Sequence, residues 1–201
     1  MKDSALVVVD MLNDFIDGTM ACKNAEEAIA SSLAFIEKET AGLIEDKEAI
    51  QDSFPIIFVR DFHPSDHSSF QAQGGPWPSH CVKHTPGAEI HKSLRPYATE
   101  ELTFFKGYDK EKEEYSGFNG KNEGGQSLQD VLSIMDIKNV FVCGIATEYC
   151  VKNTCLDLMK AGFTVWLLQD GLAYVSYEGH IQALKEMEEA GVKLMNAKTK
   201  V

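Results

Sequence analysis

The sequence predicts an α/β protein built as three layers, α/β/α, around a central, mostly parallel, six-stranded sheet. Along the 201 residues, six short apolar runs rich in β-branched side chains alternate with stretches of helical periodicity. Alternation of this kind is typical of a parallel sheet that helices cover on both faces. We interpret the apolar runs as buried strands, at residues 5–10, 55–61, 102–107, 139–146, 164–171 and 192–197.

The segments between these runs show the spacing of amphipathic helices. A helix is also expected over 148–161, because Gly162 follows it as a left-handed stop before the next strand begins. This helix and its two flanking strands predict one right-handed crossover unit. The periodic apolar positions are Ile29, Leu33, Ile36, Leu43 and Ile44 after the first strand, and Ile181, Leu184 and Met187 before the last.

One long segment shows neither the helical nor the strand periodicity of apolar residues. Residues 62–101 are rich in proline and glycine, and a second glycine-rich loop follows at 107–125. Long irregular insertions in compact domains usually carry function. The sequence contains no repeat and no interdomain linker, so we expect a single domain over 1–201, with a lid or metal-binding insertion at about 62–101.

The composition restricts the partners. A formal net charge of −12 and a pI near 4.9 exclude a sequence-independent grip on nucleic acid or on anionic lipid, because both need a positive surface. The apolar runs are all shorter than the roughly 20 residues that span a bilayer. Five cysteines without CxxC spacing disfavour a disulfide framework and a thiolate zinc cage. We therefore expect a soluble, cytoplasmic protein that binds neither nucleic acid nor membranes, and the sequence leaves a homo-oligomer open.

Reactive side chains stand where the first four expected strands end. In open parallel sheets, ligands bind outside the carboxyl ends of the strands. We therefore expect these four ends to bring carboxylate, imidazole, ammonium and thiol groups to one edge of the sheet. The residues are Asp10 after the first strand, Asp61, Phe62 and His63 after the second, Lys106 after the third, and Ala146 to Cys150 after the fourth.

Cys150 is the candidate nucleophile. A free thiol has a pKa of about 8.5 and is mostly protonated at neutral pH, so it needs activation. The start of a helix and the ammonium group of Lys106 would favour the thiolate, and Asp10 would accept its proton as a general base. The N–H groups of Ala146 and Cys150 are candidates for an oxyanion hole. The alternative is a packed core cysteine, which the nearby strand ends with Asp10 and Lys106 disfavour.

Asp61 and His63 are candidate metal ligands. Residues two apart in an extended chain point to the same side, so this carboxylate and imidazole can share one ion. Such ligands suit zinc, iron or manganese, and His67 and His80 in the same insertion strengthen the prediction. A site with three protein ligands and open positions would be catalytic rather than structural. The alternative is a simple hydrogen-bonded pair in a loop.

Two aromatic residues, Phe15 and Trp77, flank these polar groups in the sequence. If they line a pocket, their rings would sandwich a flat ligand. The alternative is that they pack in the core or in the lid.

Six blocks of sequence stand in order from residue 5 to about 171, nearly the whole chain. They are VVVDMLNDF at 7–15, RDFHP at 60–64, WPSHCV at 77–82, FKG at 105–107, YSGF at 115–118 and GIATEYCV at 144–151. This set resembles the isochorismatase-like cysteine hydrolases and, within them, the nicotinamidases and pyrazinamidases. Each block alone is moderately specific, whereas the ordered set is a strong signal.

The resemblance implies a Rossmann-like hydrolase that converts nicotinamide to nicotinate and ammonia in NAD salvage, and that also acts on pyrazinamide. By similarity, Asp10, Lys106 and Cys150 form a catalytic triad in which Cys150 attacks the amide carbon, ammonia leaves and a thioester remains. Water activated by Asp10 then hydrolyses the thioester. The resemblance also implies a cis peptide bond before Ala146, which turns the N–H of Ala146 into the oxyanion hole.

The resemblance further implies a cofactor, one divalent metal ion held by Asp61, His63 and His80. Zinc is the expected ion, with iron and manganese as alternatives. In such enzymes the ion mainly seats the pyridine nitrogen of the substrate. By similarity, Phe15 and Trp77 would stack on the pyridine ring.

The sequence departs from the family pattern at one position and leaves another open. The usual glutamine of the first block is Leu12 here, which we expect to change only the packing beside the site. His67 lies four residues after His63, where some relatives place an additional metal ligand and others do not. Its role is therefore left open.

Two alternative functions compete with this prediction. The first is another cysteine amidohydrolase of the same superfamily, acting on a carbamoyl or ureido compound without a metal, which the three candidate metal ligands disfavour. The second is a non-enzymatic binding or redox-sensing protein that uses Cys150 as a reactive thiol. That hypothesis leaves Asp10 and Lys106 without a purpose. An isochorismate-type vinyl ether hydrolase is disfavoured because its chemistry does not use the cysteine.

Overall fold

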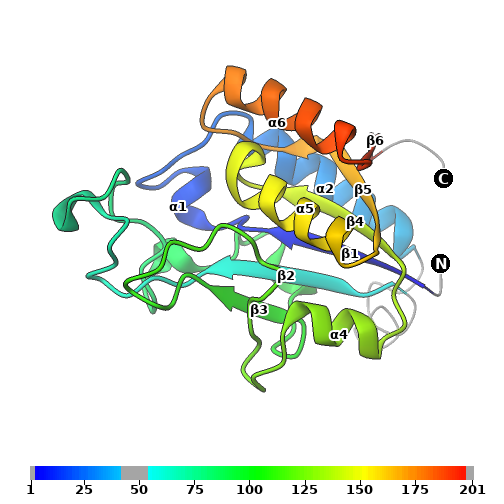
Figure 1. Cartoon of the computed structure of the whole chain (residues 1–201), viewed down its shortest axis with the longest axis horizontal. Coiled ribbons are helices and arrows are strands. Elements are labelled where there is room, and N and C mark those ends of the chain that lie inside the picture. The colour runs from blue at the N-terminus through cyan, green and yellow to red at the C-terminus, as the bar shows by residue number, and fades with distance from the viewer. Residues whose placement is uncertain (1–2, 42–53, 198–201) are drawn as a thin grey trace.

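The computed structural model describes residues 3–41 and 54–197. Within these ranges, strands and helices alternate as the sequence predicts (Figure 1). Two of the periodic apolar positions, Leu43 and Ile44, lie outside the described residues. Among the helices of the two described ranges, none has both the length and the apolar character needed to cross a lipid bilayer.

The six strands form one sheet in the order β3-β2-β1-β4-β5-β6, and every neighbouring pair is parallel. The first strand lies in the middle, between β2 and β4, so the chain winds outward from it in both directions. Ligands bind at such switch points in α/β sheets. The strands are β1 Ser4–Val9, β2 Ile56–Asp61, β3 Thr103–Lys106, β4 Asn139–Gly144, β5 Thr164–Leu172 and β6 Lys193–Met195.

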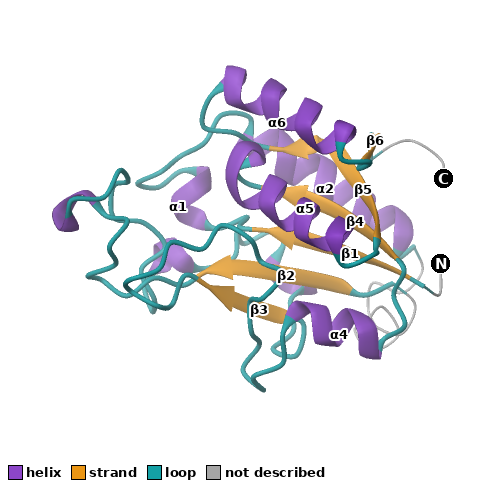
Figure 2. Ribbon diagram, in the orientation of Figure 1, coloured by secondary structure: helices purple, strands orange, loops and turns teal. Residues whose placement is uncertain are grey.

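Helices cover both faces of the sheet, which confirms the predicted three layers (Figure 2). Side chains of the central strand alternate between two cores because neighbouring residues in a strand point to opposite faces. Leu6 and Val8 pack with Phe35 of α2, whereas Val7 packs with Leu158 of α5 on the other face. The helices are α2 Ala25–Glu39 on one face, and α4 Leu128–Ile134, α5 Lys152–Lys160 and α6 Tyr177–Glu189 on the other.

The structure differs from the sequence-based expectation in local detail. Two short helices were not expected, α1 Asn13–Ile16 and α4, of which α4 begins with a capping box formed by Ser127 and Asp130. The helix expected over 148–161 is present, but it starts with a π-helical turn, Thr147–Val151, before α5. Ile181 fits the helical period of α6 but is 47% exposed, because α6 packs on the sheet through Ala183 and Met187.

The first part of the irregular segment 62–101 lies beyond the carboxyl ends of the strands, on the left in Figure 1, whereas Leu94, Tyr97 and Ala98 pack against the core on the α2 face of the sheet. It contains three short 3-10 helices, at Gln71–Gln73, Pro86–Ala88 and Arg95–Tyr97. Isolated bridges fix it locally, and one of them pairs His63 with Val82. The segment therefore covers the same edge of the sheet at which the reactive residues were expected.

Candidate active site

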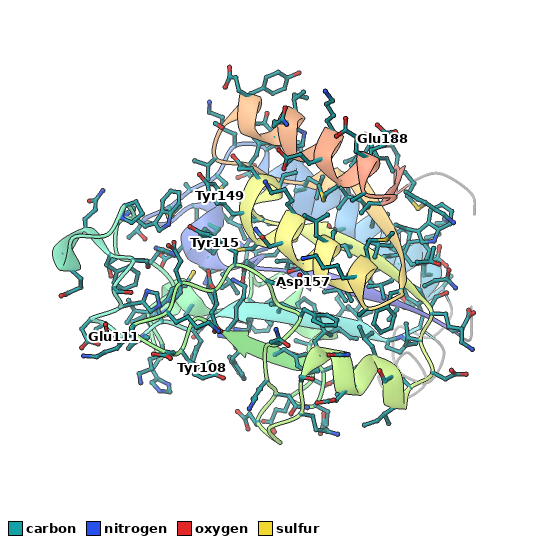
Figure 3. All side chains as sticks on the ribbon, in the orientation of Figure 1. Tyr108, Glu111, Tyr115, Tyr149, Asp157 and Glu188 are labelled. Carbon is teal, nitrogen blue, oxygen red and sulfur yellow. The ribbon has the colours of Figure 1, made fainter. Side chains whose placement is uncertain are left out.

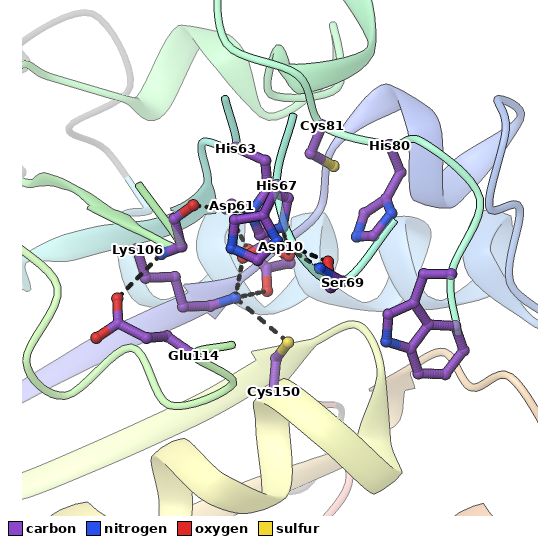
Figure 4. A network of polar contacts seen from close by, with 12 residues as sticks. Asp10, Asp61, His63, His67, Ser69, His80, Cys81, Lys106, Glu114 and Cys150 are labelled. Carbon is purple, nitrogen blue, oxygen red and sulfur yellow. Dashed lines mark hydrogen bonds and ion pairs between the residues drawn. The ribbon is translucent and has the colours of Figure 1, made fainter. Parts of the chain in front are cut away.

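Four neighbouring strands deliver the predicted site residues to one edge of the sheet (Figure 4). Asp61 and Lys106 are the last residues of β2 and β3, and they stand opposite each other in the parallel register. Asp10 directly follows β1, and Cys150 lies in the π-helical turn after β4. The strand order β3-β2-β1-β4 places all four ends side by side, which confirms their predicted proximity.

Lys106 is the centre of the polar cluster. Its side chain is 1% exposed, and its Nζ atom lies 2.8 Å from Oδ2 of Asp10 and also contacts Oδ1 of Asp61. The same ammonium group donates to Sγ of Cys150 at 3.3 Å. Sγ of Cys150 and one carboxylate oxygen each of Asp10 and Asp61 lie within 4.8 Å of one another. The structure thus brings the three predicted triad residues into mutual contact distance.

Burial and charge set the protonation of this cluster. Burial, with the nearby charge of Asp61, raises the pKa of Asp10 to about 6 despite the opposing ammonium of Lys106. Burial alone would lower the pKa of Lys106, but the two carboxylates beside it hold that pKa well above its usual value. Burial also raises the pKa of the Cys150 thiol, and Lys106 opposes this only in part. The resting cluster therefore contains a protonated amine, a protonated thiol and an Asp10 carboxyl group suited to exchange a proton near neutral pH.

The backbone holds Asp10 in an uncommon conformation. Its φ angle of 50° lies in the left-handed region, where residues with a β-carbon are rare. Oδ1 of Asp10 accepts the backbone N–H of Asp61 at 2.8 Å, which fixes the carboxylate between β1 and β2. Uncommon backbone conformations of this kind cluster at functional sites, where they hold a side chain in its working position.

The turn that carries Cys150 is anchored by Ala146. The carbonyl of Ala146 accepts the N–H groups of Tyr149 and Val151, at 3.1 Å and 3.2 Å. The peptide bond between Ile145 and Ala146 is cis, as the resemblance implies. Within residues 3–41 and 54–197, the N–H of Ala146 donates to no protein acceptor, which leaves it free for a ligand.

Asp61, His63 and His80 form a cluster that fits a divalent metal ion. One potential ligand atom from each lies within 4.8 Å of the other two, and all three residues are buried. Nδ1 of His63 donates to the carbonyl of Gly107, and Nδ1 of His80 donates to the carbonyl of Pro78, both at 2.8 Å. Because a carbonyl only accepts hydrogen bonds, the lone pair of each neutral ring is on Nε2, and Nε2 of His63 lies 3.5 Å from Oδ2 of Asp61. This donor set of two imidazoles and a carboxylate is the chemistry of a catalytic zinc site.

The charges in this cluster favour metal binding at His80 and Asp61, whereas the raised pKa of His63 favours a proton that a bound cation would have to displace. Burial lowers the pKa of His80, which favours the neutral imidazole that a metal requires. Burial opposes the same protonation in His63, but the Asp61 carboxylate outweighs it and raises the pKa of His63. Burial likewise acts against ionised Asp61, but Lys106 and His63 hold its pKa well below the usual range. Asp61 is therefore anionic at any physiological pH.

Gly107 supports the cluster from behind His63. Its φ angle is +66°, and a β-carbon at this position would lie 2.4 Å from Cε1 and 2.6 Å from Nδ1 of His63. A glycine is therefore required for the imidazole to approach the backbone and to donate to the Gly107 carbonyl. The FKG block of the sequence thus supplies both the ammonium group of Lys106 and the backbone carbonyl that positions His63.

His67, whose role the sequence left open, lies beside the cluster without joining it. Its Nδ1 accepts the backbone N–H of Ser69 at 3.2 Å and lies 2.7 Å from the Ser69 hydroxyl. Its Nε2 lies 3.2 Å from the carbonyl of Lys112, to which it can only donate. Both ring nitrogens are therefore used by the protein, so His67 holds the irregular segment to the loop that follows β3.

A pocket of about 460 Å³, its open mouth included, leads to these groups. Its lining includes Cys150, Ala146, Asp61, His63 and His80, together with Phe15 and Trp77. Sequence reasoning missed Tyr115, Tyr149 and Glu113 as further lining residues (Figure 3 labels the two tyrosines). The tyrosines belong to the YSGF and GIATEYCV blocks, which were the available signal. The pocket is also lined by residues that no motif singles out, namely Met20, Ser69, Glu114 and Val175.

Comparisons with known proteins agree with this geometry. The nicotinamidase/pyrazinamidase of Mycobacterium tuberculosis is 36% identical over 194 residues, which cover 95% of this chain and 97% of that protein. The crystal structure of pyrazinamidase of Pyrococcus horikoshii in complex with zinc superposes with a TM-score of 0.81 at 37% identity, covering 96% of this chain and 99% of that one. PnC1 of L. infantum in complex with nicotinate superposes with a TM-score of 0.78 at 29% identity, covering 100% and 96%.

The whole described sheet and its pocket fall inside one family match. The isochorismatase domain model matches residues 4–199, which include every strand and every lining residue named above. The chain therefore belongs to the isochorismatase domain family.

Proposed function

We propose that this chain hydrolyses nicotinamide to nicotinate and ammonia in NAD salvage, and that it also hydrolyses pyrazinamide. The observation that carries the proposal is the contact of Lys106 with both Asp10 and Cys150 at the end of an aromatic pocket. The similarity to nicotinamidases and pyrazinamidases over nearly the full chain supports the same reaction. An uncharged, flat aromatic amide also fits a pocket whose lining includes the ring of Phe15.

The first half of the reaction forms a thioester. Asp10 takes the proton of the Cys150 thiol, and the ammonium of Lys106 stabilises the thiolate that results. The sulfur attacks the amide carbon, and the N–H groups of Ala146 and Cys150 hold the oxyanion. Asp10 then gives its proton to the amide nitrogen, the carbon–nitrogen bond breaks and ammonia leaves. A pKa of about 6 for Asp10 suits both transfers, because such a group accepts and releases protons readily near neutral pH.

The second half hydrolyses the thioester. Asp10, again unprotonated, removes a proton from a water molecule that takes the place of ammonia. The water oxygen attacks the thioester carbon, the carbon–sulfur bond breaks, and nicotinic acid forms, which loses its proton to solvent as nicotinate. The proton on Asp10 returns to the sulfur of Cys150, which restores the starting state. Lys106 stays protonated throughout, because the two carboxylates beside it raise its pKa.

We propose that Asp61, His63 and His80 hold one divalent ion, with zinc as the preferred species. When bound, the ion supplies a Lewis-acidic position for the pyridine nitrogen and so orients the ring. The zinc complex of the Pyrococcus horikoshii pyrazinamidase supports this assignment, as do the hydrogen bonds that engage Nδ1 of His63 and His80 and leave Nε2 as the ligand atom. Phe15 and Trp77 would enclose the ring from the walls of the pocket.

An ammonia-release assay with nicotinamide, pyrazinamide and small carbamoyl compounds tests the proposal. We expect turnover of the two aromatic amides and its loss, by at least about 10³-fold, in Cys150→Ala. Cys155→Ala is a matched control, because Cys155 is an equally buried thiol on α5 outside the pocket lining. Absence of nicotinamide turnover, or turnover of carbamoyl compounds alone, would contradict the proposed substrate. Substantial residual activity in Cys150→Ala would contradict the nucleophile.

A further inference from the structure

A carboxylate that the proposed reaction does not use stands at the pocket. Glu113 lies in the loop after β3 and lines the pocket together with Trp77, Tyr115 and Tyr149. The indole N–H of Trp77 donates to Oε1 of Glu113 at 2.9 Å, and the hydroxyl of Tyr115 donates to the same oxygen. One carboxylate oxygen therefore connects the irregular segment 62–101 to the loop after β3.

The rings that Glu113 connects form a continuous aromatic wall. Tyr149, next to Cys150 in the chain, packs edge-on against Trp77 with ring centroids 5.2 Å apart, and its ring lies 5.4 Å from that of Tyr115. Tyr115 and Tyr149 lie close together above the sheet edge in Figure 3. Burial and the Glu113 carboxylate raise the pKa of Tyr115, so its phenol stays a hydrogen-bond donor. The Glu113 hydrogen bonds thus hold two of the three rings in place.

The charge of Glu113 is not balanced by a cation. Neighbouring Glu114 also lines the pocket, but its charge is paired with Lys112 at 2.6 Å, whereas no lysine, arginine or histidine of the described ranges lies within ion-pair distance of Glu113. Glu113 is solvent-exposed and still contributes to the pocket lining, so its negative charge acts on whatever enters. A carboxylate next to a pocket attracts cations, leaves neutral molecules unaffected and repels anions.

We propose that Glu113 is a specificity-determining residue that sorts aromatic ligands by charge. Its two hydrogen bonds fix Trp77 and Tyr115 for a flat neutral ring, and its charge disfavours an aromatic carboxylate. The reaction proposed above converts a neutral amide into such a carboxylate. Glu113 would therefore weaken the binding of the product relative to the substrate. The choice of nicotinamide and nicotinate as this ligand pair rests on the proposed function.

Two substitutions separate the hydrogen bonds of Glu113 from its charge. Glu113→Gln keeps an acceptor oxygen for Trp77 and Tyr115 but removes the charge, whereas Glu113→Ala removes both. Glu111→Gln is the matched control, because Glu111 is an exposed carboxylate of the same loop, paired with Lys110, outside the pocket lining. Dissociation constants for nicotinamide and nicotinate are measured by calorimetry on zinc-loaded protein in the Cys150→Ala background, where no turnover occurs.

We expect Glu113→Gln to tighten nicotinate about 3- to 10-fold and to change nicotinamide less than about 2-fold, the size expected for one partly solvated charge. This gain should disappear near 1 M salt, where the screening length is about 3 Å. Glu113→Ala should in addition weaken nicotinamide about 3- to 10-fold, because the ring wall loses its acceptor. Glu111→Gln should change neither constant.

Equal shifts for both ligands in Glu113→Gln, or the same selective shift in Glu111→Gln, would overturn the inference. Its failure is distinguishable from failure of the proposed function. If the wild-type protein releases no ammonia from nicotinamide while the two constants respond as expected, the reaction is wrong and the charge selection stands. If ammonia is released and the constants do not respond, the charge selection alone is wrong.

Discussion

Replacing Gly107 by alanine tests how closely the backbone supports the metal cluster. The new β-carbon would lie 2.4 Å from Cε1 and 2.6 Å from Nδ1 of His63. Ordinary contact between carbon atoms begins near 3.5 Å, so the imidazole would have to retreat by about 1 Å. Such a movement breaks the hydrogen bond from His63 to the Gly107 carbonyl and displaces the Nε2 atom that faces the other two ligands.

The magnitude can be estimated from these contacts. A β-carbon at a φ of +66° costs about 1–2 kcal/mol by itself, and the lost hydrogen bond adds about 1 kcal/mol. We therefore expect Gly107→Ala to lower the free energy of unfolding of the metal-free protein by about 2–3 kcal/mol. Because a partner that orients a metal-binding histidine is worth about 10- to 100-fold in affinity, zinc binding should weaken by a similar factor.

Urea denaturation and competitive zinc titration measure the two effects. Gly125→Ala is the control, because Gly125 also has a positive φ, +78°, but a β-carbon there meets nothing within 4 Å. The control should lose about 1–2 kcal/mol of stability and keep its zinc affinity. If Gly107→Ala and Gly125→Ala bind zinc equally well, the argument that Gly107 seats His63 is refuted.

Three further changes have defined expected outcomes. Lys106→Met leaves two buried carboxylates without their counter-ion, so we expect loss of ammonia release and a decrease of about 3–5 kcal/mol in the free energy of unfolding, measured in urea. His63→Ala should lower the bound zinc measured by elemental analysis, whereas His67→Ala should leave the stoichiometry unchanged, because both His67 ring nitrogens already bond to the protein. Ser127→Ala removes the cap of α4 and should cost about 1 kcal/mol of stability, seen as a lower urea midpoint, with activity unchanged.

Each of these outcomes can be contradicted by a definite result. An active Lys106→Met protein would show that the ammonium group is dispensable. Loss of zinc from His67→Ala would show that this imidazole, despite its two partners, contributes to the ion site. An unchanged urea midpoint in Ser127→Ala would show that the cap of α4 contributes nothing measurable to global stability.

The layer order and the meeting of the reactive residues were predictable from the sequence. The strands are buried on both faces, so they appear as continuous apolar runs, and the first three runs lead directly to the polar residues Asp10, Asp61 and Lys106. Parallel strands present all their carboxyl ends at one edge of the sheet. A reactive residue at the end of a predicted strand could therefore be assigned to that edge from the sequence alone.

The parts that could not be predicted depend on contacts between loops. Glu113, Tyr115 and Tyr149 face the same pocket only because the loop after β3 folds over the turn that carries Cys150, and no local period encodes that approach. The partners of His67 belong to two separate segments, so its sequence spacing from His63 could not decide its role. The start of the short α4 could have been predicted from the capping box that Ser127 and Asp130 form.

The ammonium group of Lys106 is carried by the outermost strand of the sheet. β3 has four residues and pairs with β2 on one side, while its other side has a single bridge, Phe105 to Lys121, within the described ranges. Short edge strands open at a lower free energy than strands in the middle of a sheet. Fraying of this strand would withdraw the cation from both carboxylates and from the sulfur at the same moment. Mild heating should therefore abolish ammonia release at a temperature at which the backbone amides of the central strands are still protected from hydrogen exchange.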